Sequence, residues 1–236
     1  MIETAESRVE AIAAELRAQI LNGKYGPGER LPSERELSER MGVNRASARE
    51  ALKKLEQLGM VTIRRGGGAR VVPLEEAGLG VLRHVLGGAA PKREIVSQWL
   101  DVHELVISGA ARFAMERGTP EEIAQAKRLL RRLCDISLSN EQHVVVVDEL
   151  TDLIARASRN VVLRMVRDGL TSTAKRRDDK RKLMRAPRKL LLPIVRDIER
   201  AMDARDADAA EASVRRLLRE NRPVVLDMLC GPEAQA

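Results

Sequence analysis

Aromatic side chains are almost absent from this chain of 236 residues, which holds one Trp, one Tyr and one Phe although 44% of its residues are hydrophobic. A core must therefore consist of Ala, Val, Ile, Leu and Met, which pack well between helices. Strands favour β-branched and aromatic residues, so the composition argues against a large sheet. It also argues against a protein that stacks single-stranded nucleic acid on aromatic rings.

Cysteines and long apolar runs are scarce as well. The two cysteines, Cys134 and Cys230, provide no disulfide framework and fit a reducing compartment. Apolar runs such as residues 144–147 are far too short to cross a bilayer, and the start of the chain lacks the basic and apolar regions of a signal peptide. We therefore expect a cytoplasmic protein that does not contact a membrane. Its excess of 42 Lys+Arg over 35 Asp+Glu suits an anionic partner.

Helix signals dominate the beginning of the chain. Apolar residues recur with a helical period over residues 7–22, which predicts an amphipathic helix. Ser33 and Glu36 form a capping box that starts a second helix, and Gly42 ends it. Asn44 caps a third helix that follows at once. Two short helices joined by a tight turn are typical of a helix-turn-helix.

A short hairpin follows these helices. Residues 60–63 and 69–72 flank three glycines at 66–68, a pattern that predicts two small strands and a turn. Residues 1–72 are therefore predicted to form a winged helix-turn-helix domain that binds DNA, with the hairpin as its wing. Such a domain lays its second helix in the major groove, with the N-terminal residues of that helix at the base edges. We expect DNA contacts from Arg35, Asn44, Arg45, Ser47, Arg49, Arg65 and Gly66.

The rest of the chain shows helical patterns. Residues 73–91 are predicted to be a linker with a short helix. Thr119 and Glu122 form a further capping box, with Pro120 at the first helical position. The predicted fold class is mainly α, with the wing as its β structure and residues 92–236 as an all-α helical bundle. The other helices of this bundle are predicted at residues 95–113, 142–158, 160–186, 188–204 and 207–229.

Three stretches of the first domain resemble the GntR family of bacterial transcription regulators. They are PGERLPSEREL at residues 27–37, GVNR at 42–45 and REAL at 49–52. The resemblance implies that Arg35, Arg45 and Arg49 contact an operator and that Gly66 reaches the minor groove. It also implies a homodimer that binds a short pseudo-palindromic operator in double-stranded DNA.

The helical region resembles the effector domain of the FadR-type subfamily. The matching motifs are TPEE at residues 119–122, ASRN at 157–160 and DAD at 206–208. Many members hold a divalent metal through one Asp and three His, and the metal binds a carboxylate effector. The matching positions here are Val147, Thr151, Val195 and Leu217. Aliphatic side chains cannot ligate such an ion, and we therefore predict no metal and no cofactor.

Loss of the metal moves the resemblance toward the metal-free branch, whose best-known member senses fatty acyl-CoA. We expect effector contacts from Thr151, Asn221 and Arg112, although Glu104 stands where the family usually carries an effector-binding arginine. Val and Leu in place of metal ligands suit an acyl chain, or they simply fill a core. The basic residues between 175 and 189 are interpreted as a solvated helix face, and the alternatives are an anchor for a phosphorylated ligand or an auxiliary DNA contact.

The leading hypothesis is a DNA-binding transcription repressor whose helical domain senses a small metabolite, such as a fatty acyl-CoA or another carboxylic acid derivative. The alternative is an effector-independent DNA-binding protein with a purely structural dimerisation bundle. An enzyme is not expected, because the sequence has no His-Glu-x-x-His motif and no phosphate-binding glycine loop after a strand.

Overall fold

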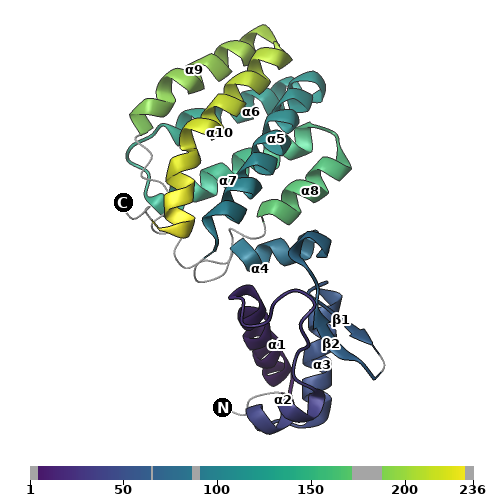
Figure 1. Cartoon of the computed structure of the whole chain (residues 1–236). Coiled ribbons are helices and arrows are strands. Elements are labelled where there is room, and N and C mark those ends of the chain that lie inside the picture. The colour runs from purple at the N-terminus through teal and green to yellow at the C-terminus, as the bar shows by residue number, and fades with distance from the viewer. Residues whose placement is uncertain (1–4, 65, 87–90, 172–187, 232–236) are drawn as a thin grey trace. The chain divides into compact units, whose positions relative to one another are not determined.

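The computed structural model describes residues 5–64, 66–86, 91–171 and 188–231. The chain forms two compact units, Met1–Gly88 and Ala89–Ala236, each with its own hydrophobic core (Figure 1). In the described ranges, one two-stranded sheet accompanies a set of helices, so the mainly α fold class is confirmed. None of the helices in these ranges is long and apolar enough to span a membrane.

The first unit begins with three helices, α1 (Ala5–Leu21), α2 (Glu34–Met41) and α3 (Arg45–Gln57). The predicted capping box is present at the start of α2. The Glu36 amide donates to the Ser33 hydroxyl over 3.3 Å, and the Ser33 amide donates to the Glu36 carboxylate over 2.7 Å. The hydrogen bond from the Ser33 amide lowers the pKa of Glu36, so this carboxylate stays charged near the positive end of the helix dipole.

The turn between α2 and α3 depends on Gly42 and Asn44. Gly42 has a φ of 63°, a left-handed conformation that glycine adopts without a steric cost. Asn44 Oδ1 then accepts from the Ser47 amide over 2.8 Å and caps α3. Both features confirm the sequence predictions. Helix α1 packs against α3, and Leu16 and Leu55 are fully buried in the core of this unit.

The wing consists of the antiparallel strands β1 (Val61–Arg64) and β2 (Gly68–Val71). Val61 pairs with Val71 and Arg64 pairs with Gly68, so the turn falls at the predicted glycines. The segment after the wing belongs to the same compact unit. It forms two 3-10 turns, η1 (Leu74–Glu76) and η2 (Leu79–Val81), and a short helix, α4 (Leu82–Leu86).

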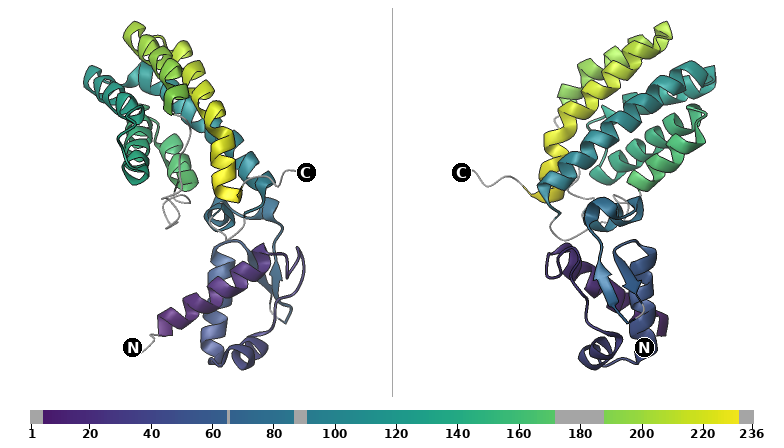
Figure 2. Two further views of the ribbon diagram at one scale, coloured as in Figure 1. Left: turned by 90° about the vertical axis from the view of Figure 1, so that its left-hand side faces the viewer. Right: turned by 45° about the vertical axis from the view of Figure 1, so that its right-hand side comes forward.

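The second unit is an all-α bundle, which confirms the prediction. Its described helices are α5 (Arg93–Arg117), α6 (Pro120–Leu133), α7 (Asn140–Ala157), α8 (Val161–Thr171), α9 (Arg188–Ala204) and α10 (Ala207–Cys230). Helices α5 and α10 run side by side, as both views in Figure 2 show. The helix predicted at residues 160–186 is described as far as Thr171. Residues 172–187, with most of the basic stretch, lie outside the described residues.

Charged side chains connect α5 and α10. On α10, Arg222 lies 2.6 Å from Asp101 of α5 and Arg219 lies 3.0 Å from Glu104 of α5. The polarity is reversed further along, where Arg112 of α5 pairs with carboxylates at the start of α10. Exposed ion pairs contribute little to stability, but these pairs specify which residues of the two helices lie opposite one another.

Two glycines of the second unit are expected to respond oppositely to alanine. Gly109 lies inside α5 with open space around an added Cβ, so Gly109→Ala should stabilise this unit by about 0.5–1 kcal/mol through helix propensity. A Cβ at Gly118 would overlap the Ala114 carbonyl oxygen, so Gly118→Ala should destabilise it by at least about 1 kcal/mol. Urea unfolding followed by the emission of Trp99, the single tryptophan, measures both. Equal effects would contradict the packing described.

Candidate DNA-binding surface and effector region

Arg45 stands at the first position of α3. Its side chain is exposed and has no hydrogen-bond or ion-pair partner within the described ranges, so its guanidinium is free to meet a base edge. Asn44 is exposed beside it, with its carbonyl oxygen used in the helix cap. Ser47 does not share this surface. The residue is only 9% exposed, because it lies one turn before Ala51 on the packed face of α3, so little of it is accessible for the predicted DNA contact.

Arg35 and Arg49 are exposed but face carboxylates of their own unit. Arg49 of α3 forms a bidentate pair with Glu34 of α2, in which Nε lies 3.0 Å from Oε1 and Nη2 lies 3.0 Å from Oε2. The hydrogen bonds and the charge of Glu34 raise the pKa of Arg49. Arg35 lies 3.6 Å from Glu39, one turn later on α2. Sequence reasoning missed Glu34, because a contact between two helices leaves no local spacing signal.

The wing presents backbone at its turn and cations on its strands. Gly66 has a φ of 74° and is exposed, and it carries no side chain of its own to keep a groove away from its backbone. Arg64 is exposed on β1, and Arg70 of β2 donates from Nη1 to the Gly28 carbonyl over 2.8 Å. Arg65, a predicted DNA contact, lies outside the described residues.

In the second unit, the positions that match the family's metal ligands are part of the hydrophobic core. Val195 is 4% exposed, and Val147 and Leu217 pack against the same cluster. These side chains do not fit a divalent ion, since they offer no oxygen, nitrogen or sulfur. In the part of the chain that the structure describes, no group of three His, Cys, Asp or Glu residues is placed to hold a metal.

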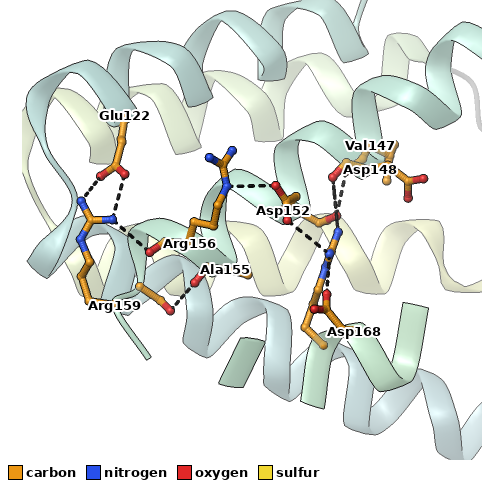
Figure 3. Close-up of polar contacts among 11 residues, drawn as sticks. Glu122, Val147, Asp148, Asp152, Ala155, Arg156, Arg159 and Asp168 are labelled. Atoms are coloured by element: carbon orange, nitrogen blue, oxygen red, sulfur yellow. Dashed lines mark hydrogen bonds and ion pairs between the residues drawn. The ribbon is translucent and has the colours of Figure 1, made fainter. Parts of the chain in front are cut away.

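Thr151, the fourth of these positions, contacts a buried arginine instead. Figure 3 shows Asp148, Asp152 and Asp168, which lie around this contact. Arg167 of α8 is 3% exposed, and its Nη2 donates to Thr151 Oγ1 over 2.9 Å and to the Asp148 carbonyl over 3.4 Å. Its Nη1 donates to Asp168 over 2.8 Å and lies 3.6 Å from Asp152 of α7. Sequence reasoning also missed Arg167. The available signal was an arginine on the apolar stripe of a predicted helix.

A histidine and the tryptophan lie close to this network. The rings of Trp99 and His103 on α5 are 5.1 Å apart between centroids and tilted by 36°. Burial, with a smaller contribution from the charge of Arg167, lowers the pKa of His103 to about 4. His103 is therefore neutral at pH 7.

The other two predicted effector contacts have different partners. Arg112 is surrounded by carboxylates, with Glu116 at 3.1 Å, Glu211 at 3.4 Å and a further ion pair with Asp208. Asn221 donates from Nδ2 to the Leu217 carbonyl of its own helix over 3.0 Å. Each of the three predicted residues is thus engaged in a separate set of hydrogen bonds.

Comparison with known families agrees with this division. The family model for bacterial regulatory proteins of the gntR family matches residues 8–71, and the model for the FCD domain matches residues 98–220. The chain belongs to the GntR family. It is a DNA-binding transcription regulator of that family with an FCD effector-binding domain.

Named relatives of this GntR chain are also transcription regulators. The chain is 32% identical over 196 residues to the HTH-type transcriptional regulator Mce2R of Mycobacterium tuberculosis, an alignment that covers 76% of this chain and 82% of the relative. It is 29% identical over 158 residues to the fatty acid metabolism regulator protein of Shewanella putrefaciens, which covers 59% and 66%. Lar, which controls expression of the Listeria monocytogenes agr system, has the same fold at 16% identity, a TM-score of 0.57, and coverage of 91% and 94%.

The burial of His103 predicts a pH dependence of stability. Its folded pKa of about 4 lies below the ordinary value of 6.5, so between these values the unfolded chain binds more protons. Stability should therefore fall by up to about 3 kcal/mol as pH drops from 6.5 to 4. His103→Gln should remove most of this slope in urea unfolding followed by Trp99 emission wavelength. An unchanged slope in the variant would place its origin elsewhere.

Proposed function

We propose that this GntR regulator is a homodimeric repressor. Its two winged domains would bind the half-sites of a pseudo-palindromic operator, with Arg35, Arg45, Arg49 and Gly66 as the central contacts. Asn44 would assist through its exposed amide, Arg65 through its charge, and Ser47 through no more than the small exposed part of its side chain. The observation that carries the proposal is the free guanidinium of Arg45 at the N-terminal end of α3.

Arg45 is suited to direct readout of a base. The cap at Asn44 fixes the first turn of α3, and an arginine fork matches the two acceptors that guanine presents in the major groove. Lys53, two turns further along α3, pairs with Glu50 over 2.9 Å. We assign Lys53 to phosphate contact, because a lysine head group is a point charge without a preferred plane.

We further propose that the FCD domain binds a carboxylic acid derivative with an apolar tail, such as a fatty acyl-CoA. The apolar side chains of Val147, Val195 and Leu217 support this class of tail. Thr151 and Arg167 supply a hydroxyl and a positive charge beside them. Arg112 and Asn221 remain candidate contacts, and Arg112 would have to exchange carboxylate partners to reach a ligand. Effector binding would promote or release DNA binding by favouring one dimer geometry over another. A ligand with equal affinity for both geometries would leave their populations unchanged.

One observation favours the second candidate, an effector-independent regulator with a structural bundle. The three apolar side chains pack against a continuous core cluster, and Val195 is buried within it. A filled core needs no ligand to be stable.

Substitution of Arg45 tests the DNA-reading proposal. Duplexes selected from a random pool by the wild-type chain define its preferred sequence. Arg45→Ala should lose about 1–3 kcal/mol of discrimination at one base position of each half-site, whereas Lys53→Ala should weaken binding evenly across sequences. Competition binding against scrambled duplexes at fixed salt measures both effects. A preference that survives Arg45→Ala would show that another residue reads this position.

Ligand-induced stabilisation tests the effector proposal. A ligand at 100 times its Kd should stabilise the folded chain by about 2.7 kcal/mol. Thermal unfolding with palmitoyl-CoA, free palmitate and small carboxylates, with free CoA as the control, should reveal a shift for the acyl compounds and a change in operator affinity. Thr151→Val retains the volume of the side chain and should reduce the shift. No shift with any compound, and unchanged operator affinity, would favour the structural bundle.

A further inference from the structure

We propose that Glu34 is a positioning residue for Arg49. Its carboxylate holds one edge of the Arg49 guanidinium, so that the opposite edge is presented to DNA in a fixed orientation. This inference rests on the proposed DNA-reading function, and it adds an acidic residue that sets sequence specificity without touching a base.

The pair is bidentate and connects two helices. Arg49 Nε lies 3.0 Å and 3.2 Å from the two carboxylate oxygens of Glu34, and Nη2 lies 3.0 Å from Oε2. Two parallel hydrogen bonds fix the plane of the guanidinium as well as its position. A single contact, such as the 3.6 Å approach of Arg35 to Glu39, leaves that plane free to rotate.

The contact leaves the reading edge of Arg49 open. A guanidinium has five N–H donors, and Glu34 engages the side formed by Nε and Nη2. Nη1 makes no hydrogen bond to any described residue, and the Arg49 side chain is 57% exposed. The edge formed by Nη1 and the second hydrogen of Nη2 is the one that can bond guanine O6 and N7 in a plane.

The backbone on both sides of the pair is held in place. Glu34 follows Ser33, whose capping box starts α2, and Arg49 lies in the second turn of α3, whose start is capped by Asn44. Between the helices, the Ser38 hydroxyl donates to the Val43 carbonyl over 2.5 Å. Little freedom is left in the backbone, so the carboxylate and the guanidinium meet without a rearrangement of either helix.

Electrostatics makes the expected effect of Glu34 unusual. An ion pair this exposed contributes little to folding stability, and a carboxylate beside the DNA surface repels phosphates. Glu34 should therefore weaken binding to arbitrary DNA while strengthening preference for the correct sequence. Substitution of a residue that only supported the fold would instead weaken both arbitrary binding and sequence preference.

The experiment compares matched carboxylate substitutions in the full-length chain. Wild type, Glu34→Gln, Glu50→Gln and Arg49→Ala are each used to select duplexes from a random pool. Glu50→Gln is the control, because Glu50 also pairs with a cation of α3, Lys53. We expect Arg49→Ala and Glu34→Gln to lose preference at the same base pair by about fivefold or more, and Glu50→Gln to keep it. Both Gln variants should bind scrambled duplex more tightly than wild type.

The other outcomes overturn the inference. If Glu34→Gln keeps the full preference, or if Arg49→Ala weakens all sequences equally, Glu34 does not orient a reading edge, although the proposed function stands. If the wild type itself enriches no common sequence, the proposed function fails first. Should Glu34→Gln unfold more readily, Glu34→Asp keeps the charge at the start of α2 and withdraws the carboxylate, and it must show the same loss.

Discussion

The left-handed turn at Gly42 is the constraint on which the DNA-binding surface depends. It redirects the chain directly after α2, and Glu34 in the first turn of α2 pairs with Arg49 in the second turn of α3. The two caps then fix the start of each helix, and these two helices carry the exposed arginines at positions 35, 45 and 49 that we propose as DNA contacts. A residue with a Cβ at position 42 would resist this φ. The helical part of the proposed reading surface thus consists of two short helices, and their arrangement depends on a few hydrogen bonds and one glycine.

The second unit must fix the relative positions of its helices with few aromatic rings. Its core is aliphatic, with Leu, Val, Ile, Ala and Met from five helices in one cluster. Aliphatic contacts alone specify helix register weakly, and charged pairs between α5 and α10 add that information along the seam. The polarity of these pairs reverses along the seam, and an offset of the two helices would separate Arg112 from Asp208 and Glu211. The ion pairs between α5 and α10 thus specify how the two helices align more than they stabilise the bundle.

Much of the fold could be predicted because its signals are local. Ser33, Asn44 and Thr119 each act within three residues, and the structure forms all three caps. The burial of Ser47 could not be predicted in this way, because the cap at Asn44 does not reveal that position 47 continues the packed stripe of Ala51 and Leu55.

Most of the candidate sites could be predicted only as positions, not as contacts. The sequence places Arg49 and Thr151 on helix faces, and their partners Glu34 and Arg167 come from other helices. The distance in sequence is fifteen residues for Arg49 and sixteen for Thr151, beyond the reach of any capping or i,i+4 rule. Such contacts depend on how helices pack, which no local pattern records.

The buried guanidinium of Arg167 allows α8 one axial position relative to α7. Apolar surfaces slide past one another at small cost, whereas a buried charge that leaves its partners is stranded in a low-dielectric interior. Displacing α8 by even one turn would separate Arg167 from Thr151 and Asp152 together. The contacts of Arg167 therefore fix the axial position of α8 relative to α7. Any movement that the FCD domain transmits through α8 must be a concerted motion with α7, or a complete release, rather than a gradual slide.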